Sequence, residues 1–394
     1  MFRTYAQLVR LPNVFTALAD ICLGTFVALT VATLPNHTST LTNSLSRHLE
    51  QMKLTFEVFA GCWPAFIVLL LASACLYSAG MVWNDYFDVE QDRRDRPFRP
   101  IPSGRVSPRM ALSLGLALIC LGLLFAGLGG RSGRLKLTND SLDALRAAEV
   151  PDSVLVKLKK TEDRVFASRK QLAGELTKVL QKDEVERWQN TILNNATRAE
   201  SGWTPVPLIL AGLLVLSIFA YDAGLKRTWA GPLGMGMCRL LNVLLGVCIL
   251  PGALEPWSIH LALVVGIYIT GVTWFARTEA QPSNRRALAG AAAVMLMGIA
   301  LGLLLPAYPA FPAGSGSILF PYLLVSLGFT IGIALVRAIR SPGPVEVQQA
   351  VKRSIMGLVA LDAILACGLI GELGLAILVL LLPAVYLGRW IYST

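Results

Sequence analysis

The sequence has few of the side chains that usually bind transition metals. Its 394 residues include only three histidines, and its seven cysteines show no C-x-x-C spacing. Every cysteine lies inside an apolar run, where a thiol behaves as a small buried hydrophobic group. We therefore expect neither a disulfide framework nor a zinc centre.

Charge is also scarce. Only 15% of the residues are charged, 54% are hydrophobic, and the mean hydropathy is +0.59. Many apolar runs are near twenty residues long, the length that a helix needs to cross a bilayer. This composition excludes an ordinary soluble protein. The first run, at about residues 14–34, lacks a small-residue cleavage site, so we expect a retained span and not a removable signal peptide.

The formal net charge of +10 could suggest a nucleic-acid partner. The basic residues are scattered at the ends of the apolar runs, however, where membrane topology and anionic lipid headgroups account for them. We therefore expect the partner of this surface to be the lipid bilayer and expect no binding of nucleic acid.

Ten apolar runs indicate an all-α polytopic membrane bundle of about nine or ten spans. The last two runs are separated only by Gly371 and Glu372, so a re-entrant hairpin or one tilted helix is an alternative. Lysine and arginine concentrate in one set of loops, which the positive-inside rule places in the cytoplasm. The runs cover about residues 14–34, 58–83, 109–129, 204–222, 231–251, 257–276, 286–306, 318–338, 354–371 and 373–391.

A polar segment, residues 131–203, separates the third and fourth runs. Leu172, Leu176 and Leu180 within it keep helical spacing. We therefore predict three parts: spans one to three in 1–130, a small soluble helical insert in 131–203, and the remaining spans in 204–394. The insert should lie on the non-cytoplasmic face. Its mixed charges favour a plain solvated surface, and docking of a protein partner is the alternative.

An acidic stretch follows the second apolar run. If the helix continues past that run, Asn84, Asp88 and Asp92 recur at i, i+4 and i+8 and project from one face. Mg²⁺ prefers oxygen ligands and is usually held by one or two carboxylates together with substrate phosphates. The stretch therefore predicts a magnesium and diphosphate site at the membrane surface. The alternative is an interfacial turn in which arginines simply neutralise the carboxylates.

The full stretch is more specific than this spacing. The pattern N-x-x-x-D-x-x-x-D is followed by R-P-I-P-S-G-R, residues 99–105, and L-V-R-L-P-N precedes the first run. Together they resemble the UbiA superfamily of intramembrane prenyltransferases, over nearly the whole chain apart from 131–203. The resemblance implies a prenyl diphosphate donor, an acceptor and Mg²⁺ held by Asn84, Asp88 and Asp92. Asp88 and Asp92 would be catalytic, and Arg99 and Ser103 would contact the substrate.

A second set of candidate residues ends the fourth run. Lys226 is a mobile ammonium and Arg227 a planar fork, both suited to diphosphate oxygens. With Tyr221 they are similar to the family's tyrosine-to-lysine motif, although four residues intervene here and not the usual three. We predict a catalytic Lys226 with Tyr221 and Arg227 as substrate contacts. Anchoring by positive charge is the alternative.

Two polar residues lie inside the fifth run. Arg239 and Asn242 stand at i and i+3, so both should face the bundle interior and pair there. We predict that they line a substrate-binding cavity. A packing ion pair between Arg239 and either Asp20 or Asp362 is the alternative.

The loop after the sixth run contains no aspartate. The family usually has a second aspartate motif there, whereas residues 273–284 retain Glu279 as the only carboxylate, near Arg277. We name both as substrate-binding candidates. This degenerate motif looks more like the EboC-like branch, for which resemblance suggests moving or modifying a small metabolite at the bacterial inner membrane.

Two functions remain at this point. The first is magnesium-dependent transfer of a prenyl group from a prenyl diphosphate to an unidentified acceptor, in a site facing the cytoplasm. The second is non-catalytic binding or transport of a small metabolite on the same scaffold. The dense acidic and basic stretch at residues 84–105 favours the enzyme, because a plain scaffold leaves that stretch without a purpose.

Overall fold

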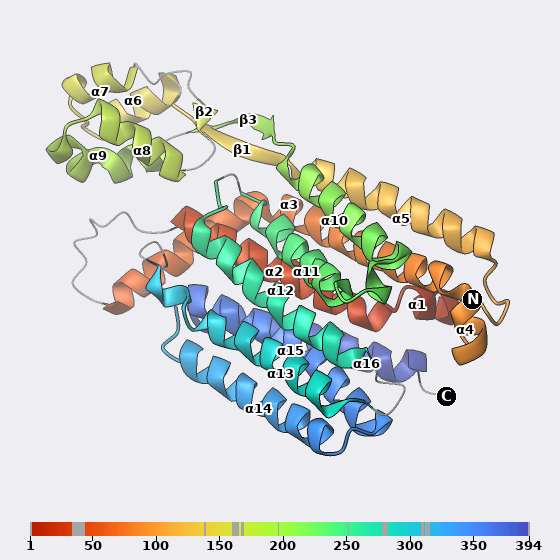
Figure 1. The fold of residues 1–394 in the computed structure, drawn as a ribbon. Coiled ribbons are helices and arrows are strands. Elements are labelled where there is room, and N and C mark those ends of the chain that lie inside the picture. Colours follow the sequence, from red (N-terminus) through yellow and green to blue (C-terminus); the bar gives the residue numbers. More distant parts are fainter. Residues whose placement is uncertain are drawn as a thin grey trace.

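The computed structural model shows a bundle of long helices with a small lobe at one end (Figure 1). It describes residues 2–33, 44–137, 139–159, 165–166, 169–195, 197–250, 252–277, 283–308, 311 and 316–392. Eight helices in this part of the chain are long and apolar enough to cross a membrane, and one further apolar helix is shorter. The predicted all-α membrane bundle is confirmed.

The long helices form the body of the molecule. They are α2 (Leu11–Thr33), α3 (Ser44–Phe87), α5 (Pro108–Gly129), α10 (Val206–Ala223), α11 (Gly231–Val247), α12 (Pro256–Ala276), α13 (Arg285–Gly302), α14 (Phe320–Arg340) and α15 (Pro344–Ile370). Shorter helices are α1 (Phe2–Leu8), α4 (Val89–Asp95), η1 (Leu225–Arg227), η2 (Leu305–Ala307), η3 (Gly371–Leu380) and α16 (Leu381–Tyr392).

The ten predicted runs all recur as apolar helical segments, and they differ from the eight long helices for two reasons. Helix α11 has only 17 residues, and the last two runs form one apolar stretch, Pro344–Ile391. Gly371 divides this stretch with φ of 70°, a left-handed conformation that glycine adopts without steric cost. There the chain reverses, so that η3 packs on α15 and α16 packs on α2.

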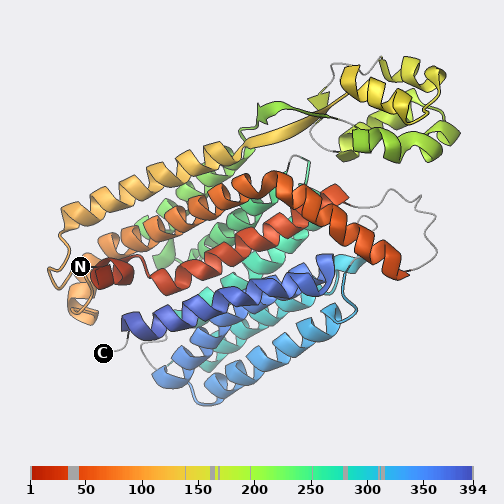
Figure 2. The ribbon, with the colours of Figure 1, turned by 180° about the vertical axis from the view of Figure 1, so that it is seen from behind.

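Both termini lie at the same end of the bundle as α4 (Figures 1 and 2). The loops that follow α10, α12 and α14 meet at this end as well. Arg277 donates hydrogen bonds to the backbone carbonyls of Lys226 and Thr228, and the backbone N–H of Ser283 donates to the carbonyl of Pro342 at 3.1 Å. We call this the site end.

The insert lies at the opposite end (Figure 2). It contains the helices α6 (Asn139–Ala147), α7 (Asp152–Lys159), α8 (Arg169–Val179) and α9 (Lys182–Asn195), packed on a common apolar core. It also contains the strands β1 (Arg131–Lys136), β2 (Val165–Phe166) and β3 (Thr197–Trp203), in the antiparallel order β2-β1-β3. The sequence did not predict this sheet, because β1 and β3 are polar and lack the alternation of apolar residues typical of strands.

Helix α2 lies at the centre of the bundle and packs on α3, α11 and α15. Its closest approach is to α11, where Gly24 faces Gly246. A methyl group on Gly24 would lie 2.6 Å from the backbone nitrogen of Val247. Small residues that allow such backbone contact are typical of packing between membrane helices. The contact fixes α2 against α11 close to Asp20 and Arg239, two residues of the site.

Candidate functional site

The end of α3 and the helix η1 meet around one ammonium group. Lys226 donates to Oδ1 of Asn84 at 3.1 Å, and its Nζ lies 2.8 Å from Oδ2 of Asp88. The side chain of Lys226 is only 11% exposed. Two of the three predicted metal ligands thus face one cation, and that cation belongs to the protein.

The third predicted ligand has a different partner. Asp88 interrupts the helix with φ of −94° and ψ of 6°, so that Asp92 stands on the separate helix α4. Nη1 of Arg99 donates to Asp92 at 2.7 Å and to Asp85 at 3.1 Å. Burial raises the pKa of Asp92, and the hydrogen bond from Arg99 opposes this effect. Arg99 therefore joins two buried carboxylates.

Two residues of this charge network were not among the predicted site residues. Asp85 is buried and accepts a second hydrogen bond from Nη2 of Arg10 at 3.2 Å. Both residues lie inside segments that the sequence singled out, the acidic stretch and the L-V-R-L-P-N segment. The signals that could have found them were the position of Asp85 next to Asn84 and the position of Arg10 inside the L-V-R-L-P-N segment.

The arrangement fits Mg²⁺ in part. Among the described residues, no three histidine, cysteine or acidic side chains gather into a ready metal cage. Asn84 and Asp88 nevertheless direct an amide and a carboxylate oxygen at one position that already attracts a cation, the Lys226 ammonium. This donor set suits Mg²⁺, which is commonly held by one or two carboxylates with substrate phosphates.

The remaining residues of the fourth-span motif lie around Lys226. Arg227 is 65% exposed, with Nη2 at 3.9 Å from Oδ1 of Asp88, and Tyr221 lines a cavity. Asp222 is buried, and its Oδ1 lies 3.8 Å from Lys226. The sequence reading missed Asp222 because it started from Tyr221. The signal was present: an aspartate four residues before a lysine, at the end of an apolar helix.

The other predicted substrate contacts have backbone partners. Arg277 holds the η1 loop through the carbonyls of Lys226 and Thr228. The Ser103 hydroxyl donates to the carbonyl of Arg99 at 2.7 Å. Glu279 lies outside the described residues.

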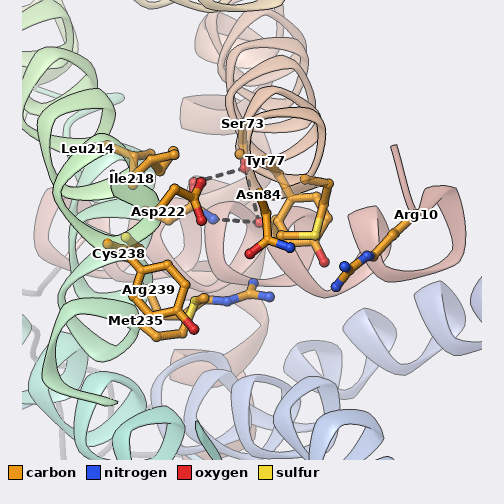
Figure 3. A pocket seen from close by; sticks show the side chains of 15 residues that line it. Arg10, Ser73, Tyr77, Asn84, Leu214, Ile218, Asp222, Met235, Cys238 and Arg239 are labelled. Carbon is orange, nitrogen blue, oxygen red and sulfur yellow. Dashed lines mark hydrogen bonds between the residues drawn. The ribbon is translucent and has the colours of Figure 1, made fainter. Parts of the chain in front are cut away.

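A cavity of about 130 Å³ extends from Asn84 into the bundle. Residues from α2, α3, α10 and α11 line it, together with Arg10 (Figure 3). Ser73 and Asn84 lie in the lining, eleven residues apart on α3, which corresponds to roughly 16 Å along a helix. The apolar part of the wall includes Met81, Leu214 and Ile218. The cavity is therefore long, partly apolar and open to the charged network.

A polar cluster forms the inner end of this cavity. Arg239 donates to Asp20 at 3.0 Å and to the hydroxyl of Thr16 at 2.8 Å, and its guanidinium lies 5.4 Å from the ring centre of Tyr77. Asn242 donates to Asp20 at 2.9 Å and accepts from Ser73 at 2.8 Å. The sequence left open whether Arg239 lines a cavity or forms a packing ion pair, and the side chain does both.

These features define the class of protein. It is an integral membrane protein with several spans, whose charged network lies at one end of a polar-ended cavity. Residues 60–134, which include the acidic stretch, match the UbiA prenyltransferase family.

Curated relatives match parts of the chain. They are digeranylgeranylglyceryl phosphate synthases, from Ignicoccus hospitalis with 35% identity over 117 residues (28% of this chain, 39% of the relative), and from Methanosarcina mazei with 30% identity over 155 residues (39% and 48%). A third, from Methanothrix thermoacetophila, is 47% identical over 66 residues (17% and 25%). The chain thus spans less than half the length of these relatives.

The fold comparison covers almost the whole chain. A solved structure from work on digeranylgeranylglyceryl phosphate synthase in membranes superposes with a TM-score of 0.51 and 14% sequence identity. The match includes 94% of this chain and 99% of the other. This likeness establishes the fold of the bundle.

Proposed function

We propose that the protein transfers a prenyl group from a prenyl diphosphate to an acceptor, with Mg²⁺, in the cavity between α3, α10 and α11. The observation that carries this proposal is the pairing of Asn84 and Asp88 around the Lys226 ammonium beside the cavity. Such a group of hard oxygens and cations suits a metal diphosphate. The match of residues 60–134 to the prenyltransferase family supports the same reading.

The residues with oxygen ligands and the basic residues would have different roles. Asn84, Asp88 and Asp92 would hold Mg²⁺, while Lys226, Arg227 and Arg99 would bind the diphosphate. Mg²⁺, when bound, neutralises the diphosphate and makes it a better leaving group. Lys226 exchanges its carboxylate partner for a diphosphate oxygen, so that its charge supports the leaving group when negative charge develops there. Arg99 would likewise exchange Asp92 for a diphosphate oxygen, which would leave Asp92 able to bind Mg²⁺.

The cavity wall offers separate surfaces to the prenyl chain and to the acceptor. Met81, Leu214 and Ile218 offer apolar surface to the prenyl chain. The polar inner end, with Arg239 and Asn242, offers hydrogen-bond donors and acceptors to a polar acceptor. The matched relatives are named as synthases of digeranylgeranylglyceryl phosphate. Because that product carries prenyl groups on a glyceryl phosphate, glyceryl phosphates belong among the acceptors to be tested.

Purified protein in lipid nanodiscs tests the proposal. Radiolabelled prenyl diphosphates of graded chain length, with Mg²⁺ and acceptor mixtures, should yield free diphosphate and a lipid-soluble product. Asp88→Asn should reduce turnover by roughly 10²–10³, as expected when a ligand of the metal that would stabilise the leaving group is lost. Asp95→Asn is the matched control, because Asp95 is an exposed carboxylate of the same stretch and should leave turnover unchanged.

The second candidate function rests on the loop after α12. It lacks the aspartates of a second metal motif, which agrees with non-catalytic binding or transport of a small metabolite in the manner of an EboC-like protein. Relation to that branch and a location in the bacterial inner membrane stay predictions. Magnesium-dependent binding of prenyl diphosphates without turnover, across all chain lengths and acceptors, would favour this alternative over the enzyme.

A further inference from the structure

The cavity contains one acidic side chain. Asp222 stands in the last turn of α10, is 3% exposed and is the only carboxylate among the fifteen described residues that line the cavity. Figure 3 shows it on the same wall as Cys238 and Arg239, opposite Tyr77 and Asn84. A buried carboxylate is costly unless it is compensated or used.

Its compensation is indirect. The Lys226 ammonium lies 3.8 Å from Oδ1 of Asp222 but 2.8 Å from Asp88. A distance of 3.8 Å is too long for a hydrogen bond, so the ammonium stabilises the charge of Asp222 without donating to it at this geometry. Asp222 thus has a nearby positive charge and an acceptor oxygen that a ligand in the cavity can reach.

No other described lining group suits the task of a base. Arg10 and Arg239 are cations that carry only donors. Asn84 and Asn242 are neutral amides, and the hydroxyl and thiol groups of the lining are neutral near pH 7. Among the described lining side chains, Asp222 is therefore the one that can accept a proton released inside the cavity.

We propose that Asp222 is the base that deprotonates a hydroxyl acceptor, an inference that rests on the proposed prenyl transfer. The acceptor oxygen forms a bond to C1 of the prenyl group, and the bond from C1 to the diphosphate oxygen breaks, with its electron pair leaving on the diphosphate. The acceptor O–H bond breaks, its electron pair stays on the new ether oxygen, and the proton passes to the carboxylate of Asp222. The acceptor class is thus an alcohol or a phenol, and general-base catalysis of this kind contributes about 10²–10⁴ to the rate.

The test compares wild-type protein with Asp222→Asn, Asp222→Glu and the control Asp95→Asn. Three quantities are measured: binding of magnesium diphosphate, hydrolysis of the donor without acceptor, and transfer to a series of phenols of increasing acidity. Asp222→Asn should lower transfer to the least acidic phenol about 100-fold or more. The deficit should shrink as the phenols become more acidic, while diphosphate affinity and donor hydrolysis stay within about threefold. Asp222→Glu should recover part of the transfer.

Other outcomes overturn the proposal. A purely structural role through Lys226 would weaken diphosphate binding, donor hydrolysis and transfer together, by the same factor for every phenol. Active wild-type protein with an unimpaired Asp222→Asn variant would refute the base alone and leave the transferase standing. Wild-type protein without turnover on any donor or acceptor would refute the proposed function, and the base with it. If Asp222→Asn does not fold, wild-type transfer that is insensitive to phenol acidity refutes the base.

Discussion

The buried charged side chains described around Lys226 and Arg99 are paired in the absence of a ligand. Lys226 is held by Asn84 and Asp88, and Arg99 joins Asp85 to Asp92. Buried charges require such partners, because leaving one of them unpaired costs several kcal/mol. In the proposed function, a metal diphosphate would therefore bind by exchanging these partners and not by filling an open charged site.

The inner end of the cavity gives a prediction about single residues. Arg239→Gln leaves Asp20, which is fully buried, without its cation. This variant should lose about 3–5 kcal/mol of stability, the usual consequence of breaking a buried ion pair. The double variant Asp20→Asn with Arg239→Gln should regain most of the loss, because it buries no charge. Thermal unfolding in detergent measures the stability of both variants. A double variant no more stable than Arg239→Gln would show that the unpaired charge of Asp20 is not the cause of the loss.

The sequence predicted the chemical type of these residues better than their pairing. Helical spacing placed Asn84, Asp88 and Asp92 on one face, and the backbone break at Asp88 then directed Asp92 to Arg99. Spacing alone could not show this, because a single non-helical residue changes the direction of every side chain after it. For Arg239, the sequence named Asp20 and Asp362 as equal partners, since only the packing of α2 on α11 distinguishes them.

At the scale of elements, the apolar runs predicted the long helices well, and the short elements poorly. In the sequence, Gly371 and Glu372 are a weak break between the last two apolar runs. Only the positive φ of Gly371 and the packing of η3 on α15 show that the chain reverses there. The strands of the insert were missed because the sequence carries no local signal for them. Their pairing partners are more than 25 residues apart, and polar strands carry no periodic signal that marks them locally.

The contact between α2 and α11 gives a prediction about elements. Gly24→Ala places a methyl group 2.6 Å from the backbone nitrogen of Val247, so the two helices must move apart. We expect a loss of about 1–3 kcal/mol of stability, as for other overpacked cores. Gly212→Ala is the control, since nothing lies within 4 Å of its added methyl group. Equal melting temperatures of the two variants would contradict the close contact.

At the scale of the whole molecule, the site end and the insert lie at opposite ends of the bundle (Figure 1). Only α5 separates the acidic stretch from the insert along the chain. This helix has 22 residues, most of them apolar, and is long enough for one crossing. The two regions should therefore face opposite sides of the membrane, with the site end in the cytoplasm by the positive-inside rule. A protein that docks on the insert would then approach from the other side.

Cysteine labelling in oriented vesicles checks this topology. Arg94→Cys and Asp152→Cys replace exposed side chains, and a membrane-impermeant maleimide should label position 94 only from the cytoplasmic side and position 152 only from the other. The parent chain, with its seven native cysteines, gives the background. Labelling of both positions from one side would mean that α5 does not cross the membrane, and the site would then share its face with the insert.

The position of the Lys226 ammonium has a consequence for the timing of repeated turnovers. Between Asn84 and Asp88 it acts as a counter-ion that is tethered to the chain and always present. In the proposed reaction, this ammonium would return to the oxygens of Asn84 and Asp88 after release of diphosphate, within the time of a side-chain rotation. The tethered ammonium would thus keep Asn84 and Asp88 compensated between cycles of the proposed reaction, without a metal ion from solution.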